Sequence, residues 1–266
     1  MSLVERFPDP TLPLPVDVEG APSPSARSAA LRGALIVIAT VQFVVFTLLG
    51  MLLYPGGAKF DHSTRSYSFF GNFFSDLGAS VTHAGLDNSA SRVLFVLALG
   101  GVGVGLLAFV PSWRFIASSR GRAGWAGWTG WVGGVAWVGW CAETCGSGSA
   151  LCFAGVGLVP WNLHLALHNA LVRLAFTLLL GFVAGLTWVQ RAHGWSTSYV
   201  RANTAYLVLL GGYVYLLFRG PSLDVPSGFA FQVVAQKVIA YASILNLGLQ
   251  GMGLRKAALK ALADPT

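Results

Sequence analysis

The stretch LRGALIVIATVQFVVFTLLGMLLY, which runs from Leu31 to Tyr54, decides the fold class of this protein. It contains one charged side chain, Arg32, and is otherwise almost entirely apolar. A helix needs about 20 predominantly apolar residues to cross the hydrocarbon core of a bilayer, and this stretch is long enough. The sequence therefore predicts a membrane span at this position.

Five further stretches have the same character, so we expect an all-α, polytopic membrane protein with six transmembrane helices. The expected spans are 31–54, 93–113, 125–142, 160–190, 199–218 and 229–254. They define a transmembrane domain over 31–254, between a Pro-rich, disordered cytoplasmic tail at 1–30 and a short cytoplasmic tail at 255–266. Glycines four residues apart predict close helix packing at two pairs, Gly101 with Gly105 and Gly130 with Gly134.

The composition of the whole chain agrees with a protein that faces lipid. Of the 266 residues, 55% are hydrophobic and only 10% are charged, whereas soluble domains carry about 25% charged residues. The net charge of +7 is spread between the apolar stretches and does not gather on one face. We therefore expect the bilayer and its anionic headgroups to be the partner of these basic residues, and we expect no nucleic acid.

The distribution of Lys and Arg predicts the orientation of the spans. Eleven of these residues lie at the two ends of the chain and in the even-numbered loops, and four lie in the odd-numbered loops. Basic residues concentrate on the cytoplasmic side of a membrane protein. We therefore expect both termini in the cytoplasm, and a location in the plasma or inner membrane with loops one, three and five facing outward.

The first outer loop contains a segment with helical periodicity. Its apolar residues recur at i, i+3, i+4 and i+7, namely Phe70, Phe73, Phe74 and Leu77. The opposite face carries polar residues, and Gly78 is a suitable helix end. The pattern predicts a short amphipathic helix at the outer membrane surface, with Asn72, Ser75 and Asp76 on its polar face.

The same loop carries a family resemblance. Tyr67-Ser68, then Asn72, then Ser75-Asp76-Leu77-Gly78 resembles the signature of a six-span prokaryotic integral membrane family known as domain of unknown function 998. His168 and Gln236-Lys237 are also similar to later segments of that family, so the resemblance covers roughly 31–254. It implies a six-span fold and topology, and it implies no activity because the family has no settled one.

Ionisable side chains within the spans are the second feature that points to a site. Such groups cost about 2.5 to 3.5 kcal/mol at mid-helix, so each needs a partner or a purpose. His164 and His168 are four residues apart and are expected to share one helix face. With the polar residues of loop one, they predict a polar site in the outer half of the bundle. Its candidate ligand-binding residues are Asn72, Ser75, Asp76, His164, His168, Gln236 and Lys237.

Three functions compete for this site. The leading hypothesis is a non-enzymatic protein, either a binder of a lipid or small molecule or an accessory subunit with neighbouring membrane subunits as partners. The alternative is a membrane-embedded lipid hydrolase, in which His164, His168 and either Asp76 or Glu143 hold a Zn²⁺ ion and a water. No other cofactor is expected. An ion or solute transporter is disfavoured, because the inner halves of the spans contain almost no ionisable residue.

Two contacts are also expected. Cys145 and Cys152 enclose a flexible Gly-Ser-Gly-Ser segment on the oxidising side of the membrane, so we predict that they form a disulfide and leave Cys141 free. A buried carboxylate without a partner is costly. We therefore predict that Asp76 contacts the fourth or sixth span through His168 or Lys237.

Overall fold

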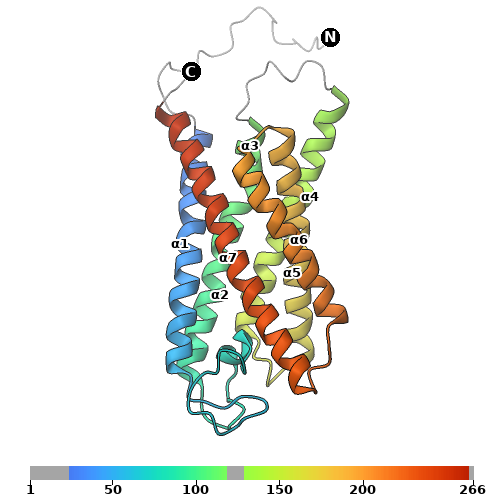
Figure 1. Cartoon of the computed structure of the whole chain (residues 1–266). Helices are drawn as coiled ribbons and strands as arrows, with labels where there is room; N and C mark the ends of the chain where they lie inside the picture. The colour runs from blue at the N-terminus through green and yellow to red at the C-terminus, as the bar shows by residue number, and fades with distance from the viewer. Residues whose placement is uncertain (1–23, 119–128, 264–266) are drawn as a thin grey trace, which may run out of the picture.

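The computed structural model describes residues 24–118 and 129–263, which form a bundle of long α-helices without a β-strand among them. α2 continues through a short 3-10 helix, η2 (Val110–Ser112), into α3 (Trp113–Ser118). A second 3-10 helix, η1 (Phe74–Gly78), lies in the long segment between α1 and α2. The six long helices are α1 (Pro24–Leu53), α2 (Ser89–Phe109), α4 (Thr129–Leu158), α5 (Leu165–Ala192), α6 (Thr197–Arg219) and α7 (Pro226–Ala263), shown in Figure 1.

Successive long helices run in opposite directions (Figure 1). α1 begins and α7 ends at the same end of the bundle, which we call the terminal end. Residues 54–88, 159–164 and 220–225 gather at the opposite end, which we call the loop end. The residues of the expected outer site therefore lie in segments at or near the loop end, with the exception of Glu143 in α4.

The outer surface of the bundle is suited to lipid. Five helical stretches are long and apolar enough to cross a membrane, and α4 is a sixth long helix of 30 residues. Large apolar side chains point outward, with Leu52 80%, Val208 73% and Leu245 65% exposed. A water-facing surface does not carry this much apolar area. The all-α class is confirmed for the described residues. The presence of six membrane spans stays a prediction.

Two span boundaries differ from those expected from the sequence. α4 continues through the Gly-Ser-Gly-Ser segment to Leu158, and α5 begins at Leu165 instead of residue 160. The small residues permit close helix packing instead of forming a loop. A Cβ atom at Gly146 would lie 2.5 Å from Val110, and the Ser149 hydroxyl donates a 2.8 Å hydrogen bond to the carbonyl of Ala175. The expected start of this span, residues 125–128, lies outside the described residues.

The two ends of the chain are more helical than expected where they are described. α1 begins at residue 24, within the predicted tail at 1–30, and α7 continues to residue 263, through most of the predicted tail at 255–266. Residues 1–23 and 264–266 lie outside the described residues.

Small residues set the spacing of neighbouring helices. A Cβ atom at Gly101 or Gly105 would collide with side chains of α1, so the close packing predicted for this pair is confirmed. A Cβ atom at Gly33 would lie 2.6 Å from the carbonyl oxygen of Gly251, which brings α1 and α7 together in the same way. At Gly134 a Cβ atom would meet nothing within 4 Å among the described residues, and the surroundings of Gly130 lie outside them, so close packing at the second predicted pair stays a prediction.

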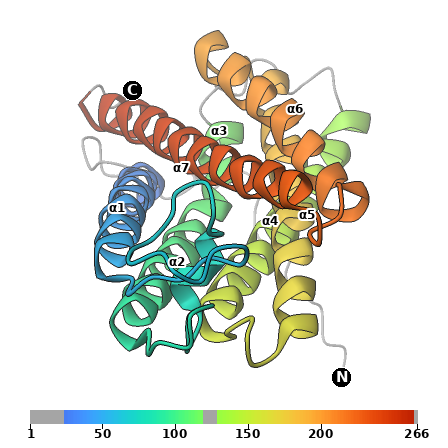
Figure 2. The same cartoon turned by 60° about the horizontal axis from the view of Figure 1, so that its bottom comes forward.

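The first loop folds over the loop end of α1 and α2, as the tilted view in Figure 2 shows. The predicted amphipathic helix is wrong in length and in placement, because the helical part is only the five residues of η1. Phe74 and Leu77 are buried within the protein, and Asn72 and Asp76 are buried too, at 0% and 2% exposed. Phe70 is 67% exposed. Residues 70–78 therefore fill the loop end of the bundle, and we call them the plug. They do not form a surface helix with a polar face exposed to water.

Candidate functional site

Asp76 is the centre of the plug. Its Oδ2 oxygen accepts hydrogen bonds from the Asn72 side-chain amide at 2.9 Å and from the backbone N–H of Phe73 at 3.0 Å. Its Oδ1 oxygen lies 3.6 Å from Nε2 of His83. Hydrogen bonds from N–H donors offset the loss of water around a buried carboxylate. Asp76 is therefore held mainly by its own loop.

Asn72 connects the plug to the turn that follows α1. Its Oδ1 oxygen accepts from the backbone N–H of Ser68 at 2.9 Å, and its Nδ2 donates to the carbonyl of Gly57 at 3.0 Å. The hydroxyl of Tyr54 donates to the same carbonyl at 3.0 Å. Gly57 has φ of 92°, and a Cβ atom there would lie 2.5 Å from the backbone nitrogen of Ala84. Only glycine fits this position without strain.

Asn88 fixes the other side of η1. Its Nδ2 lies within hydrogen-bond distance of the carbonyl oxygens of Asp76, Leu77 and Ala79, at 3.2, 3.1 and 2.9 Å. Asn88 directly precedes α2, so these bonds attach the last turn of η1 to the start of a long helix. The carbonyl groups at the end of a 3-10 helix need such partners because the helix itself leaves them free.

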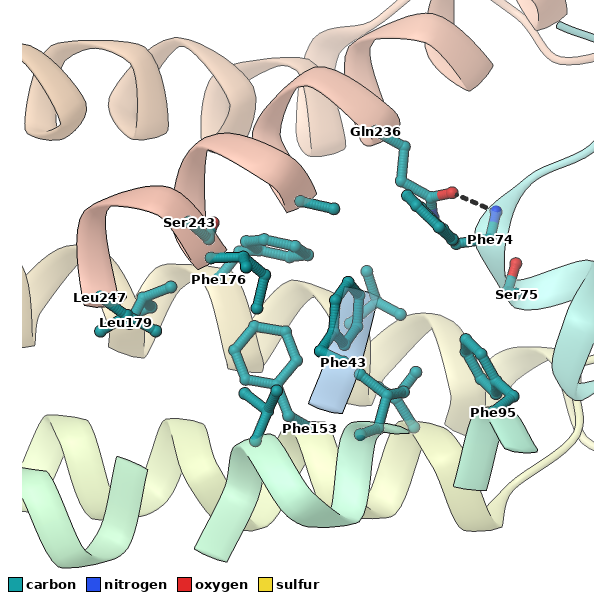
Figure 3. Close-up of a pocket in the computed structure, with 16 residues that line it drawn as sticks. Phe43, Phe74, Ser75, Phe95, Phe153, Phe176, Leu179, Gln236, Ser243 and Leu247 are labelled. Carbon is teal, nitrogen blue, oxygen red and sulfur yellow. Dashed lines mark hydrogen bonds between the residues drawn. The ribbon is translucent and has the colours of Figure 1, made fainter. Parts of the chain in front are cut away.

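Two adjacent residues of α7 hold the plug from the opposite side. Oε1 of Gln236 accepts a 2.8 Å hydrogen bond from the backbone N–H of Phe74 (Figure 3). Nζ of Lys237 donates to the carbonyl of Asn72 and lies 5.4, 5.1 and 5.6 Å from the ring centroids of Tyr67, Phe69 and Phe74. A cation over aromatic faces is stabilised by the ring quadrupoles.

The phenols near Asp76 are held in the protonated form. Burial, and then the negative charge of Asp76, raise the pKa of Tyr67 well above its usual value. The same two causes raise the pKa of Tyr54. The protonated hydroxyl of Tyr67 lies 3.1 and 3.0 Å from the carbonyl oxygens of Asn72 and Phe73, to which it donates.

The two histidines of the expected site do not share a face. His168 is buried, and its Nδ1 lies 2.7 Å from the carbonyl oxygen of Val159. His164 is exposed and stands just before the first residue of α5. The helix was expected to begin at Pro160, so the i, i+4 argument placed both side chains in a helix that contains only one of them.

Glu143 lies in α4 and not in an outer loop. Its Oε2 accepts hydrogen bonds from the indole Nε1 of Trp113 at 2.8 Å and from Nη2 of Arg114 at 2.9 Å. Both donors belong to α3, at the terminal end of the bundle. Within residues 24–118 and 129–263, no group of three His, Cys, Asp or Glu side chains is placed to hold a metal ion. The predicted set of His164, His168, Asp76 and Glu143 is therefore wrong.

The predicted disulfide is also wrong. Cys145 and Cys152 are free thiols within the continuous helix α4, as is Cys141. Seven residues of helix separate their Cα atoms by about 10 Å along the axis, which is too far for a disulfide.

Asp76 does not make the direct contact with His168 or Lys237 that we predicted. Lys237 reaches the Asn72 carbonyl, and the nearest basic side chain to the carboxylate is His83 of the same loop. The structure thus brings Asn72, Asp76, Gln236 and Lys237 into one hydrogen-bonded cluster. His164 lies outside this cluster.

An apolar cavity of about 80 Å³, partly open to the outside, lies directly beneath the plug. Five of the six long helices line it, and α6 does not. Figure 3 shows Phe74 and Ser75 of the plug at one side, with Gln236 of α7 next to them. Its apolar walls include Phe43, Phe95, Phe153, Phe176, Leu179 and Leu247.

The half of the bundle toward the terminal end contains a network of uncharged polar side chains that the sequence analysis missed. Asn203 receives a 2.8 Å hydrogen bond from Asn246 and donates one to Thr187 at 3.0 Å. Nε2 of Gln190 donates to Oε1 of Gln250 at 2.8 Å. These bonds join α5, α6 and α7, as expected for polar groups that face other helices instead of lipid.

The fold and the site define a class: an all-helical protein with membrane-type helices, in which a folded loop closes one end of an apolar cavity. Comparison of the chain with family models, curated proteins and solved structures finds no match.

Proposed function

We propose that this protein is an integral membrane protein that binds the hydrocarbon chain of a membrane amphiphile in the cavity beneath η1. The observation that carries the proposal is the cavity itself, whose walls are almost entirely aliphatic and aromatic. Binding sites for small molecules typically have apolar walls and a few precisely placed polar groups. A lipid chain is the apolar ligand that a protein in a bilayer meets at the highest concentration.

The proposal includes a membrane topology and a family assignment. Six spans, with α4 as the third, place the plug outside the plasma or inner membrane and both termini in the cytoplasm, in agreement with the distribution of basic residues. The Tyr67-Ser68 and Ser75-Asp76-Leu77-Gly78 motifs support membership of the domain of unknown function 998 family. In this arrangement the cavity lies in the outer half of the bundle, and the polar cluster around Asp76 covers it.

Photolabelling tests the proposed function. The full-length protein in lipid nanodiscs is exposed to a long-chain alcohol that carries a diazirine on its chain, and the labelled residues are identified by mass spectrometry. We expect labelling of residues that line the cavity, such as Val172 and Leu247, and loss of this labelling in the presence of excess unlabelled hexadecanol.

A pair of variants of α7 separates cavity binding from contact with bulk lipid. Ala240 lines the cavity, so Ala240→Phe should fill part of it and reduce labelling of Val172 and Leu247. Val238 is 50% exposed on the outer surface of the same helix, so Val238→Phe should leave that labelling unchanged. Equal labelling in both variants, or labelling confined to outward-facing side chains, would contradict the proposed function.

A further inference from the structure

The polar groups at the loop end of the cavity have unused hydrogen-bonding capacity. Oε1 of Gln236 is occupied by the Phe74 N–H, and this contact fixes the orientation of the amide because an N–H donor requires the oxygen. The Nε2 group therefore keeps two hydrogens, and neither has a partner among the described residues. Gln236 lines the cavity, so these donors are available to a molecule inside it.

Ser75 provides a second unused group, next to Gln236 at the same end of the cavity. Its hydroxyl makes no hydrogen bond with any described residue, although its neighbours Asn72 and Asp76 are fully engaged. Ser75 also lines the cavity (Figure 3). Ser75 and Gln236 are half-buried and both line the cavity, so an oxygen atom of a ligand in the cavity would give their unpaired groups the partner that the described residues do not.

Ser243 is the third polar residue that lines the cavity, and its hydroxyl is already hydrogen-bonded within the protein. The hydroxyl of Ser243 donates to the carbonyl of Ile239 and pairs with the hydroxyl of Tyr206, each at 2.6 Å. The free donors of the cavity are thus confined to its loop end, and the remainder of the wall is apolar or satisfied.

The lack of charged side chains in the cavity wall argues against a charged ligand. No ionisable side chain is among the residues that line it. Lys237 is adjacent in sequence to Gln236, but its ammonium group donates to Asn72 and lies against three aromatic rings. A carboxylate or a phosphate in this cavity would lose its hydration without gaining a counter-ion, at a large cost.

We infer that the ligand of this cavity is an uncharged lipid whose hydroxyl or carbonyl oxygen accepts hydrogen bonds from Ser75 and Gln236. The chain occupies the aromatic-lined space, and the oxygen lies under η1. This inference rests on the proposed function and specifies the chemistry of the head of the ligand. Long-chain alcohols and acyl esters belong to this class, and ionised fatty acids do not.

Competition between molecules of equal chain length tests the head-group selectivity. Hexadecanol, methyl palmitate, palmitate at pH 9 and hexadecane are each titrated against the photoprobe in nanodiscs. Methyl palmitate and ionised palmitate have nearly the same shape and differ in charge. We expect hexadecanol and methyl palmitate to displace the probe at concentrations about tenfold lower than palmitate, because the carboxylate must be desolvated without a counter-ion.

Two variants test the assigned hydrogen bonds. Ser75→Ala removes a hydroxyl that has no partner within the described residues, so the fold should be unaffected, and hexadecanol should bind about threefold to tenfold more weakly. Gln236→Glu keeps an acceptor for the Phe74 N–H and removes the two free donors, so it should weaken binding of methyl palmitate. Displacement by hexadecane should be unchanged in Ser75→Ala, and the matched Ser66→Ala variant, on an exposed part of the loop, should behave like the wild type.

The possible failures are distinguishable. If palmitate at pH 9 competes as well as methyl palmitate, or if Ser75→Ala and Gln236→Glu bind all oxygen-bearing competitors like the wild type, the head-group inference is wrong and the cavity still binds chains. If no competitor reduces labelling within the cavity, the proposed function itself is wrong.

Discussion

The Nδ2 amide of Asn72 donates a 2.9 Å hydrogen bond to the Oδ2 oxygen of Asp76, and both side chains are almost completely buried. These two residues belong to the plug and not to the walls of the cavity. Their role is to keep η1 in the shape that presents Ser75 to the cavity. Asp76 is therefore a structural carboxylate, and its loss should first affect stability.

Replacement of Asp76 tests this role. Asp76→Ala leaves the Phe73 N–H and the Asn72 amide without their acceptor, so we expect a loss of about 2 to 4 kcal/mol in the free energy of unfolding. Asp76→Asn keeps one side-chain oxygen and should cost less. Thermal unfolding in detergent, followed by tryptophan fluorescence, measures both. Asp61→Ala is the control, since its exposed carboxylate bonds only Ser63. Equal melting temperatures for Asp76→Ala and Asp61→Ala would contradict the structural role.

The raised pKa of Tyr67 predicts a loss of stability at high pH. Its folded-state value lies above the unfolded value of about 10. The folded protein therefore holds this proton more tightly, so stability is fully present below about pH 10 and declines as the pH rises toward the folded-state pKa. We expect the melting temperature to be flat from about pH 8 to 9.5 and to fall above pH 10. Tyr67→Phe should show a shallower fall, and an equally steep fall in this variant would assign the effect to other groups.

The expected fold and the observed fold agree where apolar length decides the structure. A run of apolar residues as long as 31–54 can satisfy its backbone in lipid only as a helix, so its secondary structure follows from composition. The clustering of Asn72, Asp76, Gln236 and Lys237 could also be anticipated, because their segments meet at one end of an up-and-down bundle.

The errors arose where small or polar residues can serve two purposes. Gly146 and Ser149 were assigned to a flexible loop, but they pack α4 against its neighbours, and this error moved Glu143 and the cysteines to the wrong place. The start of α5 was shifted by five residues, which gave His164 a helical position that it does not have. Asn88 was missed, although its place directly before α2 lets its side chain hold the preceding loop through the carbonyl groups at the end of η1.

Thiol chemistry checks the corrected description of α4. The protein is denatured without a reductant, treated with iodoacetamide and weighed by mass spectrometry. Because all three cysteines are free, three carbamidomethyl groups should be added. Addition of a single group would show that two of the cysteines are joined.

Cysteine labelling in intact cells tests the orientation of the bundle. In a variant without native cysteines, single cysteines replace exposed residues at the two ends, Ser66 at the loop end and Lys256 at the terminal end. A membrane-impermeant maleimide should label Ser66→Cys and should reach Lys256→Cys only after the cells are opened. Labelling of Lys256→Cys from outside would reverse the proposed topology.

The most direct test of the central claim is the density inside the cavity, determined by electron cryomicroscopy of the full-length protein in nanodiscs made from its native lipids. We expect an elongated, unbranched density beneath η1, between Phe43, Phe176 and Leu247, with its wider end at Ser75 and Gln236. A cavity filled by rearranged side chains, with lipid density only on the outer surface of the helices, would contradict the claim that this bundle binds a lipid chain.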